Sequence, residues 1–154
     1  MAHPPIDWHA RAREIRVDGR AVIDGERRAA LGGETFACIS PINGQSVGEI
    51  ARGRQPDIDA AVTSARAAFE DSRWAHKPPA VRKRLLQRFA EKVLAAKEEL
   101  ALLETLDMGK PIQYALSVDV PSTARCIQWY AEATDKIYDE IAPTPRSALA
   151  LITR

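Results

Sequence analysis

The chain contains 154 residues, of which 45% are hydrophobic, 28% charged and 6% aromatic, proportions typical of one folded domain. Its 22 basic and 21 acidic residues give a formal net charge of +1, so neither nucleic acid nor an anionic membrane surface is expected as a partner. The two cysteines, Cys38 and Cys126, lie far apart and form no CxxC or Cys/His motif. This spacing indicates neither a disulfide framework nor a zinc site.

The sequence shows no signal for export or for membrane insertion. Its first eight residues contain no basic segment followed by an apolar one, as a secretory signal requires. The longest purely apolar run, Ala148 to Ile152, is far shorter than the roughly 20 residues that span a bilayer. No membrane segment is therefore expected, and together with the unpaired cysteines these features predict a protein of the reducing cytoplasm.

The first 55 or so residues have the pattern of short strands and turns. Arg20 to Ile23 could pair as a strand across the Asp-Gly turn that follows them. Side chains in Glu34 to Ser40 alternate between two faces, and Gln45 to Ala51 follow an Asn-Gly pair as a second strand. Turn-forming pairs separate these runs: Asp24-Gly25, Gly32-Gly33 and Asn43-Gly44. The pattern predicts a small antiparallel meander, with Pro41 at a turn or an edge.

From Pro56 onward the spacing of apolar residues is helical. A first helix is expected to start with Asp57 as its N-cap and to end near Asp71. Its apolar face consists of Ile58, Ala61, Val62, Ala65 and Phe69. A second helix follows a Pro-Pro break and reaches about Ala96. A third spans 98–107, with Gly109 as its left-handed C-cap.

The fourth helical region contains Pro121, which must either start a helix or kink one. We expect a new helix to start near Pro121 and to run to about Tyr138, before Pro143 and Pro145. Residues 147–153 form a strand candidate at the end of the sequence. Because a strand needs a partner and the sequence shows no obvious one, this strand is expected to be unpaired within the chain.

Few residues in the sequence suggest catalytic or binding chemistry. Neither a GxGxxG nor a GxxxxGK[ST] phosphate loop is present. For Cys38 in a strand and Cys126 in a helix beside Arg125, an inert packed thiol is favoured over a nucleophile. The three histidines share no metal-ligand spacing: His3, His9 and His76. The basic cluster 82–84 with Arg88 is better explained as the polar face of an amphipathic helix than as a phosphate site.

Asp107 is the residue with the clearest potential for cation chemistry. It lies at the end of the third predicted helix, beside Met108 and Gly109. There its carboxylate meets the free carbonyl groups of the last turn, an all-oxygen environment of the kind that hard cations prefer. A local hydrogen bond to the turn explains the same residue more simply, and is favoured on this evidence alone.

Several segments resemble the aldehyde dehydrogenases. Residues 102–111, LLETLDMGKP, resemble the LETLDxGKP segment of that family. Residues 40–44 resemble its N-P-x-x-G turn, with Ser40 in place of the usual Asn. Other similar segments follow in the family's order: 57–62, 65–69, Trp74, 79–82 and 129–136. The resemblance covers about residues 20–154. Within the family, 50–53, 101–111 and 125–132 most resemble the enzymes that oxidise gamma-glutamyl-gamma-aminobutyraldehyde in putrescine breakdown.

This resemblance implies an α/β fold, or α+β for the segment by itself, with antiparallel strands, about four helices and a terminal oligomerisation strand. Residues 1–19 correspond to an N-terminal tail and 20–145 to the N-terminal part of an incomplete cofactor-binding domain. Residues 146–154 correspond to the start of an oligomerisation arm, whose strand pairs with a neighbouring subunit. The resemblance thus implies a homo-oligomer. Because the helices lack the sheet they would cover, we expect the segment alone to expose apolar surface and to aggregate or stay molten.

The resemblance also implies a function. Family members oxidise aldehydes to carboxylic acids with NAD(P), using a cysteine nucleophile, a glutamate base and an asparagine oxyanion donor. No position here matches these residues or the cofactor-binding residues, so the chain alone is expected to be inactive. The alternative to an N-terminal part of such an enzyme is a noncatalytic remnant or an oligomerisation or interaction module. Asp107 matches the family's monovalent cation ligand, and Cys38 and Ile39 match strand residues that contribute backbone carbonyls to it. Val120 and Ser122 match positions beside the substrate tunnel.

Overall fold

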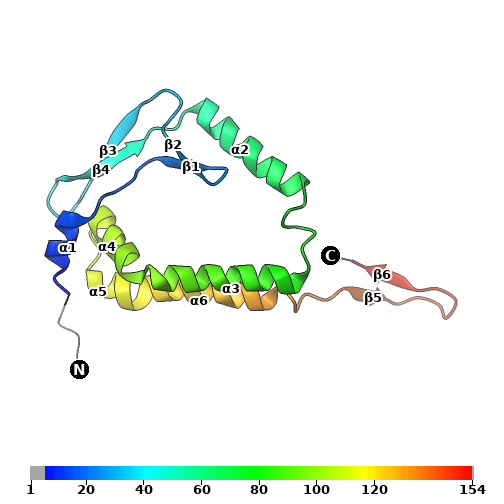
Figure 1. The fold of residues 1–154 in the computed structure, drawn as a ribbon. Coiled ribbons are helices and arrows are strands. Elements are labelled where there is room, and N and C mark those ends of the chain that lie inside the picture. Colours follow the sequence, from blue (N-terminus) through cyan, green and yellow to red (C-terminus); the bar gives the residue numbers. More distant parts are fainter. Residues whose placement is uncertain (1–5, 154) are drawn as a thin grey trace.

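The structure, a computed structural model, describes residues 6–153 (Figure 1). Its first element, α1 (Trp8–Glu14), lies within the segment expected to be an N-terminal tail. The helix forms because the Asp7 side chain accepts a hydrogen bond from the Ala10 N–H at 2.9 Å, while Arg11 and Arg13 place positive charge in its last turn. His3, considered above as a metal ligand, lies outside the described residues.

Two antiparallel hairpins follow α1. The first pairs β1 (Ala21–Ile23) with β2 (Glu26–Arg28), and the second pairs β3 (Thr35–Ile39) with β4 (Ser46–Ala51). Asp24 and Gly25 both have positive φ, as a two-residue hairpin turn of this kind requires. The expected strands are confirmed, but they form two separate two-stranded sheets and not one meander. A parallel bridge between Gly19 and Ile50 connects the first hairpin to the second.

The helix α2 (Gln55–Glu70) begins two residues before the predicted N-cap. Asp57 therefore lies inside the first turn, where its side chain accepts hydrogen bonds from the Arg54 N–H and the Leu31 N–H, each at 2.8 Å. These two bonds hold the pKa of Asp57 below its ordinary value, and the bond from Arg54 has the larger effect. Because Leu31 lies in the loop after β2, Asp57 also attaches the start of α2 to the first hairpin.

The next two helices confirm the predictions to within one or two residues. They are α3 (Pro79–Ala95), which begins with a proline in its first turn, and α4 (Lys97–Met108). Gly109 caps the end of α4, and its φ of 77° is a left-handed conformation that favours glycine. Within residues 6–153, no helix combines the length and the apolar character that crossing a membrane requires.

The fourth helical region begins earlier and ends earlier in the chain than predicted. It consists of α5 (Ile112–Tyr114), a π-helical turn η1 (Ala115–Asp119) and α6 (Val120–Ala133). Pro121 lies in the first turn of α6, near the expected start of a helix, and directly after the π-helical turn, whose irregular hydrogen bonding tolerates a residue without an N–H. Helical backbone nevertheless starts already at Ile112, and α6 ends at Ala133 and not near Tyr138.

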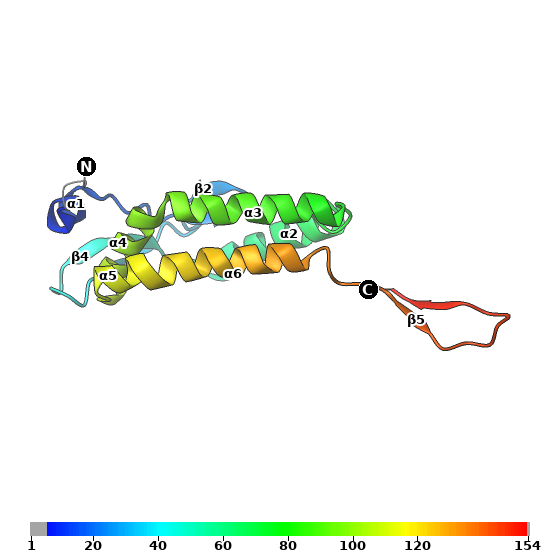
Figure 2. The same cartoon turned by 90° about the horizontal axis from the view of Figure 1, so that it is seen from below.

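The predicted terminal strand has a partner within the chain, which corrects the expectation that it would be unpaired. The strand β6 (Ala150–Ile152) pairs antiparallel with β5 (Glu140–Ala142), so that Ile141 lies opposite Leu151. The segment 143–149 between them contains two prolines and reverses the chain direction. This hairpin projects away from the helices in both views (Figures 1 and 2).

The helical part of the molecule contains a small core. The helices α3 and α6 lie side by side along their length (Figures 1 and 2), and α4 and η1 pack at one end of the pair. Ala101, Ala115 and Val120 form the centre of a buried cluster there. The chain exposes 11798 Å², about half as much again as the roughly 7,700 Å² expected for a compact protein of this size. The expected exposure of apolar surface is thus confirmed for the described residues, with Phe69, Trp129 and Leu149 among those exposed.

Substituting Gly19 with alanine should separate the two hairpins. A Cβ at Gly19 would lie 2.1 Å from the Glu49 carbonyl oxygen, which is backbone and cannot rotate away. The Ala51 N–H donates to the Gly19 carbonyl at 2.8 Å, so this bond should weaken. We expect a local cost of about 1–3 kcal/mol, measured as faster hydrogen–deuterium exchange at the Ala51 amide. In the control Gly32→Ala, where a Cβ meets nothing within 4 Å, exchange should stay unchanged, and equal rates in both variants would contradict the prediction.

Candidate functional site

The structure brings together two of the residues expected at a cation site. The Cys38 Sγ lies 3.1 Å from an Asp107 carboxylate oxygen and donates a hydrogen bond to it, although 69 positions separate the two in sequence. Cys38 lies on β3 and Asp107 in the last turn of α4. Ile39 follows directly, and the ladder between β3 and β4 is irregular between Cys38 and Ile39. Such an irregularity disrupts regular pairing and bends the strand at that point.

Gly109 positions Asp107 against the strand. The end of α4 approaches the turn after β3 so closely that a Cβ at Gly109 would lie 3.1 Å from the Pro41 ring. A side chain at this position would therefore be disfavoured twice, by the contact and by the positive φ. The glycine that ends the helix thus also lets the helix end touch the β3–β4 hairpin, where the carboxylate meets the thiol.

The environment of Cys38 disfavours its thiolate. The hydrogen bond to Asp107, with desolvation and the nearby negative charge as further causes, raises the pKa of the Cys38 thiol above its ordinary value. A nucleophilic cysteine needs the opposite shift, because the thiolate is the reactive form. The inert role expected for Cys38 agrees with this geometry. Cys126, the other cysteine, is exposed on α6.

The remaining predicted site residues lie elsewhere. Val120, at the start of α6, is only 6% exposed and belongs to the core cluster with Ala101 and Ala115. The Ser122 hydroxyl accepts a hydrogen bond from the Arg125 guanidinium at 2.8 Å. Their tunnel-lining role remains a prediction. Among the residues described, no group of three or more His, Cys, Asp or Glu side chains is arranged to hold a metal ion.

The structure contains a network of three charged side chains that the sequence pattern does not predict. The Lys110 ammonium lies 3.5 Å from a Glu104 carboxylate oxygen and also pairs with Asp119, which ends the π-helical turn. The pair with Asp119 is the main cause that raises the pKa of Lys110. All three side chains are partly buried, so the network is less screened than an exposed pair. Its members lie at irregular spacing across two helix boundaries, and helical periodicity therefore gives no signal for it.

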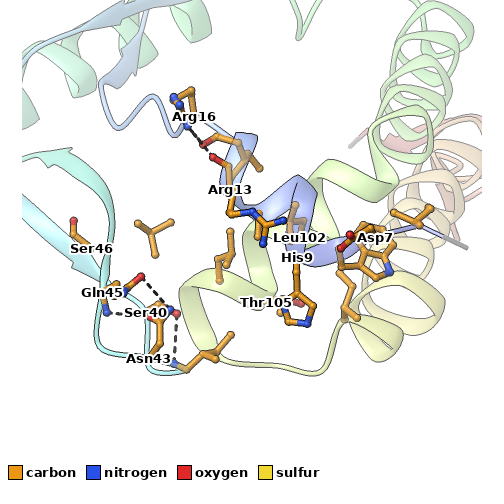
Figure 3. A pocket seen from close by; sticks show the side chains of 18 residues that line it. Asp7, His9, Arg13, Arg16, Ser40, Asn43, Gln45, Ser46, Leu102 and Thr105 are labelled. Atoms are coloured by element: carbon orange, nitrogen blue, oxygen red, sulfur yellow. Dashed lines mark hydrogen bonds between the residues drawn. The ribbon is translucent and has the colours of Figure 1, made fainter.

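A cavity of about 710 Å³ separates α1 from the turn between β3 and β4 (Figure 3). His9, Arg13 and Arg16 line it on the side of α1. The opposite wall is the turn itself, where the Asn43 side chain accepts from the Gln45 N–H at 3.0 Å. The floor is formed by α4 residues such as Leu102 and Thr105. None of the site residues predicted from the sequence lines this cavity.

A comparison with protein families matches residues 28–154 to the family described as "Aldehyde dehydrogenase family". The chain belongs to the aldehyde dehydrogenase family. The resemblance inferred from residues 102–111 and the collinear segments is therefore confirmed. The match begins at Arg28, the end of β2, and covers every helix and strand from β3 onward, whereas α1 and β1 lie before it.

Two curated relatives are similar to almost the whole chain. The NADP/NAD-dependent aldehyde dehydrogenase PuuC of Escherichia coli K12 is 46% identical over 96% of this chain and 30% of its own length. The aminoacetaldehyde dehydrogenase of Pseudomonas aeruginosa is 43% identical over the same shares. The chain thus spans about 30% of the length of these relatives.

Solved structures show the same arrangement of elements. An indole-3-acetaldehyde dehydrogenase of P. syringae in complex with NAD+ is 50% identical, with a TM-score of 0.93 over 96% of this chain and 30% of its own. The gamma-glutamyl-gamma-aminobutyraldehyde dehydrogenase of Burkholderia cenocepacia is 46% identical, with a TM-score of 0.89 over 90% of this chain and 28% of its own. The expected fold, an N-terminal segment with mixed helices and strands, is therefore confirmed.

Replacing Asp107 with asparagine should make Cys38 more reactive. The raised pKa keeps Cys38 protonated at a given pH, and a neutral amide removes the negative charge that contributes to this shift. The pKa of the thiol should therefore fall, and alkylation by iodoacetamide near about pH 8 should become several-fold faster at Cys38. Mass spectrometry of the two cysteine peptides over a pH series measures this effect. Cys126 is the internal control, and an unchanged Cys38 profile would refute the prediction.

Proposed function

We propose that this chain is the N-terminal part of an NAD(P)-dependent enzyme that oxidises aldehydes to carboxylic acids. The observation that carries the proposal is the TM-score of 0.93 at 50% identity with an indole-3-acetaldehyde dehydrogenase solved with NAD+. In this proposal residues 1–19 lead into the domain and 20–145 form the first part of its cofactor-binding domain. Residues 146–154 begin the oligomerisation arm.

In the proposed enzyme this segment has a structural role and supplies no catalytic residue. Acyl transfer through a covalent intermediate needs a nucleophile, a base and an oxyanion donor in one place. The raised pKa of the Cys38 thiol makes that cysteine unsuited to nucleophilic attack. The chain alone is therefore expected to be inactive. NAD(P), which accepts a hydride when bound, would be held by the remainder of the enzyme.

The aldehyde proposed as substrate is gamma-glutamyl-gamma-aminobutyraldehyde. Support comes from residues 50–53, 101–111 and 125–132, which resemble the enzymes for that compound, together with the 46% identity to the Burkholderia cenocepacia dehydrogenase named for it. In this proposal Val120 and Ser122, both at the start of α6, border the body of the aldehyde. Discrimination among aldehydes then depends on residues around Ser122, together with residues outside this chain.

A monovalent cation is the proposed ligand of the junction between α4 and β3. The chemistry of the donors fits such an ion, since one carboxylate and neutral carbonyl oxygens form an all-oxygen set of low charge. The Asp107 carboxylate already lies against Cys38 on the strand, next to the irregular ladder at Ile39. Asp107 would hold the ion by its side chain, and Cys38 and Ile39 by their backbone carbonyls. The ion would join the strand to the helix end.

A second candidate function is that of a noncatalytic interaction module. The hairpin β5–β6 favours it, because it projects from the helices and exposes Leu149, Leu151 and Ile152 (Figure 1). An exposed strand edge of this kind can add to the sheet of another subunit. The same hairpin would form the contact between copies in a homo-oligomer of the proposed cytoplasmic enzyme. The two functions therefore differ in catalysis and share the mode of assembly.

A chimera tests the proposed activity. It joins residues 1–154 to the part of E. coli PuuC that lies beyond its matching segment, and NAD(P)H formation is followed with gamma-glutamyl-gamma-aminobutyraldehyde. Aminoacetaldehyde and indole-3-acetaldehyde serve as comparison substrates. We expect turnover with the first aldehyde at the highest kcat/KM, and none with residues 1–154 alone. A folded chimera that oxidises none of the three would refute the proposal and favour the interaction module.

A further inference from the structure

The cavity between α1 and the β3–β4 turn has the size and the lining of a small-molecule site. Its volume of about 710 Å³ lies within the roughly 300–1,000 Å³ of cavities that bind small organic molecules. Apolar side chains from three segments of the chain form much of its wall: Trp8, Ile15, Ile42, Val47, Leu102 and Leu106. A ligand with an apolar body would therefore meet apolar contacts on several sides.

Most polar side chains around the cavity already have partners. The Asn43 side chain accepts from the Gln45 N–H at 3.0 Å, and the Ser40 hydroxyl accepts from a backbone N–H of the same turn at 3.4 Å. The Arg16 guanidinium donates to backbone carbonyls of residues 13–15. These bonds fix the turn and the end of α1, so the cavity is formed before any ligand binds.

By contrast, two polar groups that line the cavity lack a partner. The Arg13 guanidinium on α1 forms no hydrogen bond or ion pair with any described residue. The Thr105 Oγ1 on α4 is buried and has no hydrogen-bond partner among these residues. Figure 3 shows both side chains at the cavity, each on its own helix. A buried hydroxyl without a partner is unfavourable, and a ligand that brings an acceptor would remove this cost.

The charge of the lining favours an anion with a single charge. Two arginines and one aspartate line the cavity, which gives a formal charge of +1 with His9 neutral and +2 with His9 protonated. The aspartate, Asp7, accepts from the Ala10 N–H and caps α1. A dianion such as a phosphate ester would meet one unengaged cation and the repulsion of Asp7. A carboxylate suits the site better, because one guanidinium can donate to both of its oxygens.

We propose that this cavity binds a small organic carboxylate with an apolar body. The carboxylate accepts hydrogen bonds from the Arg13 guanidinium and the Thr105 hydroxyl, and the apolar body lies against side chains such as Leu102 and Leu106. The site needs no catalytic activity, so it stands or falls independently of the proposed oxidation of aldehydes.

Equilibrium dialysis with 4-phenylbutanoate tests the proposal. The neutral amide 4-phenylbutanamide has the same apolar body and serves as the comparison ligand. We expect saturable binding of one 4-phenylbutanoate per chain, and binding of the amide that is about tenfold weaker or less. Arg13→Gln, which removes the charge but keeps a side chain of similar length, should weaken binding of the carboxylate about tenfold. Thr105→Val, which replaces the hydroxyl by a methyl group, should weaken it several-fold.

Arg84→Gln is the matched control. Arg84 is exposed on α3 and does not line the cavity, so its loss changes the net charge equally and should leave the affinity for 4-phenylbutanoate unchanged. Amide chemical shifts locate the ligand, and those of residues 43–47 and 102–106 should change more than those of α3. Residues 1–154 and the single-chain chimera are both measured, so that the site is tested with and without the remainder of an enzyme.

Each result decides the proposal. Binding in either protein that is lost with Arg13→Gln, weakened with Thr105→Val and kept with Arg84→Gln upholds the site. Equal affinities for the carboxylate and the amide would show apolar adsorption only, and equal losses in the two arginine variants would show unspecific attraction; both refute it. Unchanged binding with Thr105→Val refutes the placement of the carboxylate. Absence of saturable binding in both proteins refutes the site altogether. A site that is upheld in a chimera without aldehyde oxidation contradicts only the proposed function.

Discussion

The helical part of this protein is held together by the close approach of small side chains. Of the eight buried hydrophobic residues in the described chain, six are alanines, and no large side chain is fully buried. Alanine lets helices such as α3 and α6 lie close together, but it removes little apolar area from water. The large side chains consequently point outward along α2, α3, α6 and the terminal hairpin. This constraint explains how a chain with an ordinary composition exposes so much apolar surface.

The strand half and the helical half of the chain meet through a few specific contacts. The end of α4 touches the turn after β3 where Gly109 meets Pro41, and there Asp107 accepts from Cys38. One turn further on, Lys110 ties the end of α4 to the π-helical turn through Asp119. Residues of the family segment LLETLDMGKP therefore lie at the junction between strand and helix. Their role in an intact enzyme would be to fix the relative position of strand and helix.

Local signals predicted most of the elements. The turn pairs at Asp24-Gly25 and Asn43-Gly44 located two hairpins, and the left-handed glycine at position 109 located the end of α4. The π-helical turn before Pro121 was missed, because a proline alone cannot show whether the preceding residues are already helical. The partner of β6 was missed because β5 is only three residues long and carries no alternation of its own. Of the candidate site, Cys38 and Asp107 were found through their resemblance to a family, whereas the Lys110 network left no periodic signal.

The sequence by itself determined most of the helical and extended segments, because caps, turns and apolar spacing act over a few residues, and its collinear motifs determined the family. It did not determine α1, β5 or the two ends of the fourth helical region. Only the tertiary structure decided which apolar faces find a partner. The row from Ile58 to Phe69 has the spacing of a core face in either case, but whether it is covered depends on atoms far away in the chain or in another chain. The same holds for Cys38 and Asp107, which become neighbours across 69 positions only because Gly109 lets a helix end reach a strand.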